Sequence, residues 1–146
     1  MADALALDDQ LCFALYAASR AMTAAYAPLL DALELTYPQY LVMLVLWEHD
    51  GERVSRIGER LHLDSATLTP LLKRLEARGL LERRRSRDDE RVVELFLTRE
   101  GVRLRRRAAD VPRAIWCKTE LPLPEVAKLR ATLHELTRKL RESRTG

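Results

Sequence analysis

The sequence predicts a mainly α-helical protein that carries one small β-hairpin. Apolar residues recur at helical spacing near both ends of the chain, and two capped helical segments joined by a tight turn lie between them. Alternating apolar residues then follow a charged loop, which is typical of a hairpin. With 146 residues, of which 47% are apolar and 32% charged, the chain is expected to form one domain over 1–146.

The N-terminal part is expected to form two helices. The first ends near Asp31 and has Asp8 or Asp9 as a plausible N-cap. Its apolar face is formed by Leu11, Leu15, Ala18, Met22 and Leu29. The second begins near Pro38, and residues 40–47 are apolar on nearly every side, so this helix is expected to be deeply buried.

Two helices joined by a tight turn are expected next. Ser55 can cap a short helix that carries Ile57 and Leu61. Asp64 or Ser65 opens the second helix, which covers residues 66–78 and is closed by Gly79.

A hairpin follows directly, with strands 80–85 and 91–97 around a charged loop at 86–90. A helix-turn-helix followed by a charged hairpin is the arrangement of a winged helix, in which the second helix enters the major groove of DNA.

The C-terminal part is expected to pair with another helix. Thr98 caps a helix that must bend or stop near Pro112 and carries Cys117 at its far end. Pro124 starts the last helix. Its narrow apolar seam consists of Val126, Leu129, Leu133, Leu136 and Leu140.

The distribution of charge favours nucleic acid as a partner. The whole chain carries a formal charge of +3, but residues 53–91 hold 11 Lys or Arg against 7 Asp or Glu, a net charge of +4. In the second helix, small hydroxyls near the N-terminus can reach bases and the basic residues can reach phosphates. The residues expected to contact double-stranded DNA are Ser65, Ala66, Thr67, Thr69, Pro70, Lys73, Arg74, Arg78, Arg85, Arg87, Asp89 and Arg91.

Two of these expectations are more specific. Pro70 removes one backbone hydrogen bond inside the helix, and Asp89 is expected to hold Arg91 in position by an ion pair. The alternative for the hairpin is a charged, solvated loop that binds nothing.

Several classes of protein are not supported by the sequence. We expect no membrane span, no secretory signal and a cytoplasmic location. Two cysteines and three scattered histidines, His49, His62 and His134, lack metal-site spacing, so we expect no metal and no cofactor. Glycine-rich phosphate loops and nucleophile motifs are missing from the sequence, so no enzyme class is indicated.

Residues 9–140 resemble the MarR family of bacterial regulators. The most specific matches are residues 63–75 and the run Asp89-Glu-Arg91 that leads to Leu97-Thr-Arg-Glu-Gly101. The resemblance implies a winged helix-turn-helix homodimer that binds a palindromic operator, with dimerisation helices in 9–35 and 99–142 and the DNA-binding part in 53–98.

Within that family the chain resembles the organic hydroperoxide resistance regulators, the OhrR type. Cys12 matches the reactive cysteine of that group, Tyr26 and Tyr37 match its two hydrogen-bonding tyrosines, and Cys117 matches the resolving cysteine of the two-cysteine subgroup. The resemblance implies a redox-sensing repressor, not an enzyme. Its inducer would be an organic hydroperoxide, and oxidised Cys12 would form a disulfide with Cys117 of the other subunit.

The residues supply a physical reason for this role of Cys12. A thiolate is the nucleophile toward peroxides, and the first turn of a helix, together with two phenol donors, favours the charged sulfur. An apolar sensing pocket would select organic peroxides. Its candidate residues, which also fit ordinary core packing, are Phe13, Leu15, Tyr16, Met22, Met43 and Trp47.

Two other functions remain open from the sequence. One is a MarR-type repressor that responds to a small aromatic ligand and uses neither cysteine. The other is a thiol peroxidase that binds DNA only incidentally.

Overall fold

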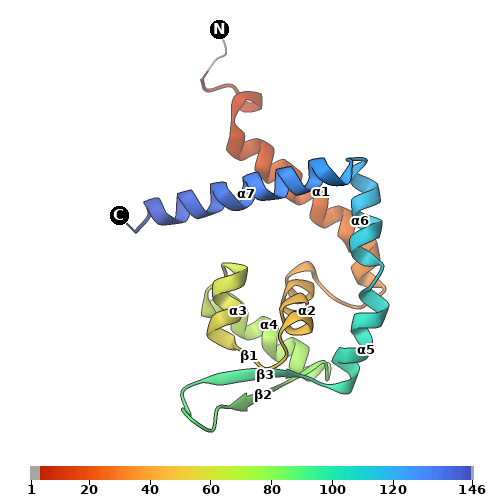
Figure 1. Ribbon diagram of the computed structural model, residues 1–146, viewed down its shortest axis with the longest axis vertical. Helices are drawn as coiled ribbons and strands as arrows, with labels where there is room; N and C mark the ends of the chain where they lie inside the picture. The colour runs from red at the N-terminus through yellow and green to blue at the C-terminus, as the bar shows by residue number, and fades with distance from the viewer. Residues whose placement is uncertain (1–3, 146) are drawn as a thin grey trace. The chain divides into compact units, whose positions relative to one another are not determined.

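The computed structural model describes residues 4–145 of the chain (Figure 1). They form two compact units, one ending at Val111 and the other beginning at Pro112. The described part is mainly helical with one small antiparallel sheet, which confirms the predicted winged-helix fold class. Within residues 4–145, no helix is long and apolar enough to cross a membrane.

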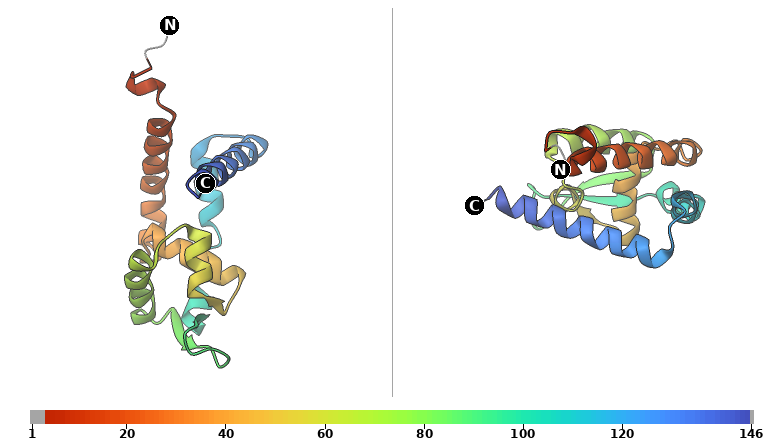
Figure 2. Two further views of the ribbon diagram at one scale, coloured as in Figure 1. Left: turned by 90° about the vertical axis from the view of Figure 1, so that its left-hand side faces the viewer. Right: turned by 90° about the horizontal axis from the view of Figure 1, so that it is seen from above.

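The first unit begins with a 3₁₀ helix, η1 (Leu7–Asp9), followed by the long helix α1 (Leu11–Asp31). The prediction that Asp8 or Asp9 is the N-cap of α1 is wrong, because both lie in η1 and Gln10 is the N-cap residue. The Gln10 side-chain amide donates to the carbonyls of Ala4 and Ala6, so it fastens η1 to the start of α1. In Figure 2, α1 is straight, and its N-terminal half extends beyond helices α2 to α5 of this unit.

Helix α2 (Tyr37–Glu48) is the buried centre of the first unit. Thr36 and Gln39 form a capping box, in which each side chain accepts a hydrogen bond from the other residue's backbone N–H. As the apolar run predicts, α2 is buried on several sides, and Val42, Met43 and Leu46 are fully buried. It contacts α1, α3, α4, β3 and α5.

The helix pair consists of α3 (Val54–Leu61) and α4 (Ser65–Ala77). Ser55 does not cap α3, because the helix already begins at Val54. Asp64 caps α4 by accepting a hydrogen bond from the Thr67 backbone N–H at 2.8 Å. Gly79, with φ +74°, follows the C-cap and turns the chain toward the sheet.

The sheet has three strands in the order β1-β3-β2, all antiparallel. The predicted hairpin is formed by β2 (Leu81–Arg85) and β3 (Val93–Leu97), while β1 (Glu52–Arg53) was not predicted. A strand of two residues has no periodicity, so the sequence carries no signal for it.

Helix α5 (Arg99–Ala108) packs closely against the rest of the first unit. Thr98 caps it as predicted, accepting from the Gly101 backbone N–H at 3.1 Å. The indole N–H of Trp47 donates to the Gly101 carbonyl at 2.9 Å. The chain breaks helical conformation after Ala108 and resumes as α6 (Val111–Thr119), which agrees with the bend expected near Pro112.

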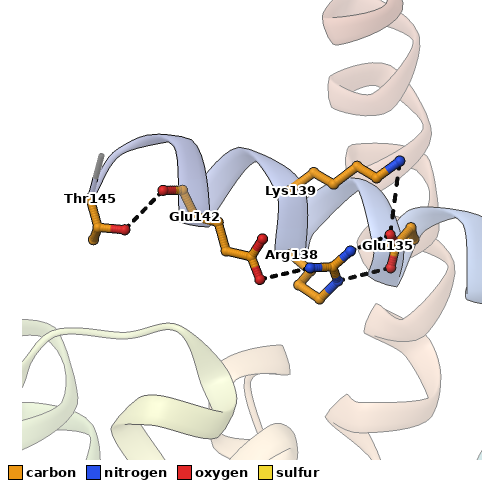
Figure 3. Close-up of polar contacts among 5 residues, drawn as sticks. All are labelled: Glu135, Arg138, Lys139, Glu142 and Thr145. Atoms are coloured by element: carbon orange, nitrogen blue, oxygen red, sulfur yellow. Dashed lines mark hydrogen bonds and ion pairs between the residues drawn. The ribbon is translucent and has the colours of Figure 1, made fainter.

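The second unit contains the rest of α6 and the long helix α7 (Leu123–Ser143). The indole N–H of Trp116 donates to the Leu121 carbonyl at 2.8 Å and stabilises the turn between α6 and α7. One side of α7 carries an ion-pair network centred on Arg138, whose guanidinium lies 2.7 Å from Glu142 and also bonds Glu135 (Figure 3). None of the residues of α7 described here is buried within the single chain, so its predicted apolar seam is open to a partner.

Gly101 is a position where only glycine fits. A Cβ at this residue would overlap the Leu80 carbonyl oxygen and press on a methyl group of Leu97. We expect Gly101→Ala to lower the free energy of unfolding by about 1–3 kcal/mol, because backbone must move to admit the methyl group. Urea unfolding measures this, with Val102→Ala at a half-exposed neighbouring site as the control. An unchanged midpoint for Gly101→Ala would contradict the close packing of α5 on the sheet.

Candidate nucleic-acid interface and thiol site

Helix α4 has one buried and one exposed face. Leu68, Leu72 and Leu75 are buried and attach the helix to the core. The opposite face is exposed and contains Ser65, Ala66, Thr67, Thr69, Pro70, Lys73 and Arg74, all of which the sequence predicts as DNA contacts. Hydrogen bonds from Thr67 lower the pKa of the Asp64 carboxyl, so the cap stays charged at neutral pH.

The two cations in the middle of this face are free to meet an anion. Lys73 and Arg74 are exposed and make no ion pair with any residue in the part of the chain described. Pro70 cannot donate a backbone hydrogen bond, so the carbonyl of Ala66 lacks its usual helical donor.

Arg78 differs from Lys73 and Arg74. It is the C-cap residue of α4, and its guanidinium donates to the backbone carbonyls of Leu33 and Glu34 at the end of α1. The structure therefore engages Arg78 within the fold, and its role as a phosphate contact stays a prediction.

The tip of the hairpin is ordered by its own charges. Asp89 accepts hydrogen bonds from the backbone N–H of Arg91 at 3.0 Å and from its guanidinium at 3.2 Å, which is the ion pair expected from the sequence. These bonds lower the pKa of the Asp89 carboxyl. Arg85 donates to the Glu90 carbonyl at 2.8 Å, and Arg87 of the same loop is exposed.

A groove of about 380 Å³ joins the exposed face of α4 to the hairpin. It is lined by Ser65 and Thr69 from α4, and by Arg83 and Arg91 from the hairpin. Arg83 was not among the predicted contacts, although alternation along β2 places it on the same face as Arg85. Arg84 points to the other face, where its guanidinium lies 4.5 Å from the centre of the Phe96 ring.

The candidate sensing thiol lies at the exposed end of α1. Cys12 is the second residue of the helix, and its side chain is exposed in the single chain. Tyr16 follows one turn later, and its hydroxyl accepts a hydrogen bond from Arg20 at 3.2 Å. Cys117, the candidate resolving thiol, lies on α6 and is also exposed.

Tyr26 and Tyr37 form an aromatic cluster at the opposite end of α1. Their ring centres are 5.0 Å apart, and Tyr40 packs against both at 5.7 and 6.4 Å. Burial raises the pKa of all three phenols, to about 12 for Tyr40, so each keeps its proton and can donate it in a hydrogen bond. Tyr40 was not among the predicted hydrogen-bonding tyrosines, although its position about one helical turn after Tyr37 indicates that the two share a face.

The structure does not bring Cys12 to this tyrosine cluster within one chain. Fourteen residues of α-helix between Cys12 and Tyr26 correspond to about 21 Å along the axis, which no pair of side chains can bridge. Any hydrogen bond from Tyr26 or Tyr37 to a Cys12 sulfur must therefore involve a second copy of the chain.

The residues expected to line a sensing pocket fall into two groups. Phe13, Tyr16 and Met22 are exposed on α1, and Leu15 is half-buried there. Met43 of α2 is fully buried, and the indole N–H of Trp47 donates a hydrogen bond to the Gly101 carbonyl. The described residues contain no group of His, Cys, Asp or Glu arranged to hold a metal ion.

Comparison with known proteins identifies the family. Residues 24–106 match the family model for the transcriptional regulator SarA/Rot. The chain is 47% identical over 140 residues to the organic hydroperoxide resistance transcriptional regulator of Bacillus subtilis, covering 96% of this chain and 95% of that protein. It is 51% identical over 139 residues to the HTH-type transcriptional regulator TtmR of Methylorubrum extorquens, covering 90% of this chain and 71% of that protein.

Solved structures of transcriptional regulators also superpose on this chain. Reduced AbfR bound to DNA superposes with a TM-score of 0.77 at 37% identity, covering 93% of each chain. AbfR has also been solved with a disulfide formed, with a TM-score of 0.62 at 35% identity and coverage of 96% of this chain and 93% of that one. A MarR family regulator from Rhodococcus gives a TM-score of 0.81 at 27% identity, covering 91% of this chain and 96% of that one.

The relatives are named as transcriptional regulators rather than enzymes, and one of them has been solved on DNA. The chain is therefore a DNA-binding transcriptional regulator that belongs to the MarR family, in the group that includes the SarA/Rot proteins and the organic hydroperoxide resistance regulators.

Proposed function

We propose that this regulator is a cytoplasmic repressor that binds a palindromic operator as a homodimer and leaves it when Cys12 is oxidised by an organic hydroperoxide. The proposal rests on the two ends of α1: Cys12 is exposed at one end, and the protonated phenols of Tyr26 and Tyr37 lie at the other. The 47% identity to an organic hydroperoxide resistance regulator supports the same chemistry.

In a two-fold dimer, Cys12 of one subunit can lie close to the tyrosine cluster of the other, although the two are far apart within one chain. If two α1 helices run antiparallel, the Cys12 end of one meets the tyrosine end of the other, so Tyr26 and Tyr37 of one subunit can donate to the partner's sulfur. The exposed apolar residues Leu11, Phe13 and Met22 on α1, and Leu129 and Leu140 on α7, supply surface for such an interface. This supports the assignment of 9–35 and 99–142 as the dimerisation helices.

In the proposed complex with DNA, α4 lies in the major groove and the hairpin reaches the neighbouring backbone. Thr67 and Thr69 are placed to read base edges, and Lys73 and Arg74 to contact phosphates. The Asp89 carboxylate holds Arg91 beside the groove that continues from α4. Two-fold symmetry requires half-sites about one helical turn apart, or a multiple of it.

The proposed release begins at the sulfur. The Cys12 thiolate attacks one peroxide oxygen; the O–O bond breaks, an S–O bond forms, and the leaving alkoxide takes a proton to become an alcohol. The resulting sulfenic acid condenses with the Cys117 thiol of the other subunit, forming an S–S bond and releasing water. This disulfide pulls the subunits into an arrangement in which the two α4 helices no longer match the spacing of the half-sites.

The preference for an organic peroxide would come from apolar surface near Cys12. Phe13, Leu15, Tyr16 and Met22 lie on the same helix within three turns of the thiol. Met43 and Trp47 on α2 pack in the core of their own chain. In the proposed dimer, α2 of the other subunit lies near Cys12, and these two side chains complete the pocket from there.

The DNA-binding assignment predicts different effects for two neighbouring residues. We expect Arg74→Ala to weaken binding to every DNA sequence and to reduce the salt dependence by about one phosphate contact. Thr67→Ala should instead alter the preferred sequence, with about 1–3 kcal/mol lost at one base pair. Titrations at several salt concentrations measure both effects, with Arg130→Ala on α7 as a charge-matched control. If affinity and salt slope are unchanged in Arg74→Ala, this face of α4 does not contact DNA.

The redox assignment predicts which variants remain on DNA after oxidation. Wild type, Cys12→Ser and Cys117→Ser are bound to the DNA upstream of the protein's own gene and treated with an organic hydroperoxide. We expect wild type to leave the DNA and Cys12→Ser to stay bound, because serine cannot be oxidised to a sulfenic acid. Gel-shift binding with non-reducing electrophoresis measures this. Equal release of Cys12→Ser would make Cys12 structural and favour a repressor controlled by a small aromatic ligand.

A further inference from the structure

The turn between α1 and α2 is stabilised by its own backbone hydrogen bonds. The Leu35 backbone N–H donates to the Leu30 carbonyl and the Glu34 N–H to the Asp31 carbonyl, both at 3.0 Å, which is the bonding pattern of a Schellman motif. Leu30, Leu33 and Leu35 are all buried. Glu34 has a left-handed φ of 55°, a conformation that costs a side-chain-bearing residue about 1–2 kcal/mol, so the surroundings must stabilise it.

Two arginines from outside α1 provide that stabilisation. Arg78, at the end of α4, donates to the Leu33 carbonyl at 3.2 Å and to the Glu34 carbonyl, and its guanidinium lies 3.7 Å from the Glu34 carboxylate. Arg107, from α5, donates to the Ala32 carbonyl at 2.7 Å. The Ala32 carbonyl belongs to the C-cap of α1, where the helix has its partial negative charge, and the Leu33 and Glu34 carbonyls follow it directly, so cations are favourably placed at this turn.

The two arginines connect parts of the molecule with different roles. Within the first unit, α1 packs chiefly on α2, and neither α4 nor α5 has an extensive interface with it. Arg78 and Arg107 therefore provide direct polar links from α4 and α5 to the helix that carries Cys12. The two side chains donate to three successive carbonyls, which lie three to five residues before Tyr37 of the tyrosine cluster.

We propose that Arg78 and Arg107 are positioning residues that couple the end of α1 to the DNA-binding helix α4. Arg107 fixes the turn at the Ala32 carbonyl, so a displacement of α1 moves the neighbouring Leu33 and Glu34 carbonyls with it. The guanidinium of Arg78 passes this change to the end of α4. Without Arg107, the turn yields and the change does not reach Arg78. Because such coupling is reciprocal, DNA bound to α4 stabilises the turn at residues 30–35. The coupling to oxidation rests on the function proposed above, whereas the coupling to DNA does not.

The two arginines differ in what can replace them. Arg107 makes one hydrogen bond to the turn, which a lysine can also make. Arg78 bonds two successive carbonyls with two nitrogens of one guanidinium, a geometry that the single ammonium of lysine does not reproduce. Arg107→Lys should therefore preserve the coupling, and Arg78→Lys should not.

Arg107→Gln is the cleanest test, because Arg107 lies outside the residues assigned to DNA. The matched control is Arg105→Gln, an exposed arginine on the same helix. Amide hydrogen exchange at residues 30–35 is measured with and without the DNA upstream of the protein's own gene. We expect DNA to slow this exchange about fivefold or more in wild type, Arg105→Gln and Arg107→Lys, and to have little effect in Arg107→Gln. Equal protection in all four proteins would overturn the proposal, as would its absence in wild type.

A second measurement separates this inference from the proposed function. The ratio of DNA dissociation constants for peroxide-treated and reduced protein is determined, alongside the rate of thiol loss. We expect Arg107→Gln to lose thiol at the wild-type rate but to show a ratio about fivefold smaller. A wild-type ratio in Arg107→Gln overturns the coupling and leaves the redox function intact. If treated wild type stays on DNA while its exchange is DNA-dependent, the redox function fails and the coupling to α4 stands.

Discussion

The structure of the first unit depends on the burial of α2. This helix is apolar on nearly every side and contacts α1, α3, α4, α5 and the central strand β3. Each fully buried side chain such as Met43 or Leu46 contributes about 1.5–3 kcal/mol relative to exposure. A helix cap contributes only about 1 kcal/mol, so packing around α2, rather than capping, fixes where the DNA-binding helix and the hairpin lie.

The other helices of the first unit are arranged around α2, and each has one face or end that is exposed. Helix α4 is attached to the core by three leucines, and its other face, the proposed DNA-binding face, is exposed. Within the first unit, α1 packs chiefly on α2, and its N-terminal half extends beyond α2–α5 (Figure 2). Cys12 is the second residue of this helix and is exposed. The proposed DNA-binding surface and the candidate sensor thus lie on different helices, α4 and α1, which both pack on α2.

Elements with a strong apolar pattern were predictable from the sequence, including α1, α2, α4 and the hairpin. Local details were not, since several polar residues near Asp8 and Ser55 can cap equally well in isolation and packing selects among them. The use of Arg78 inside the fold depends on carbonyls 44 and 45 residues away in the chain, which periodicity cannot reveal. The distance between Cys12 and Tyr26, by contrast, follows from the predicted continuous first helix, which the structure confirms.

In the proposed release mechanism, oxidation joins Cys12 of one subunit to Cys117 of the other. To test this, Cys12→Ser and Cys117→Ser proteins are mixed so that they exchange subunits, treated with an organic hydroperoxide, and examined by non-reducing electrophoresis. We expect a reducible cross-linked dimer from the mixture and none from either variant alone, because only the mixed dimer pairs the two thiols across the interface. A mixture without cross-links, in conditions where wild type forms them, would contradict it.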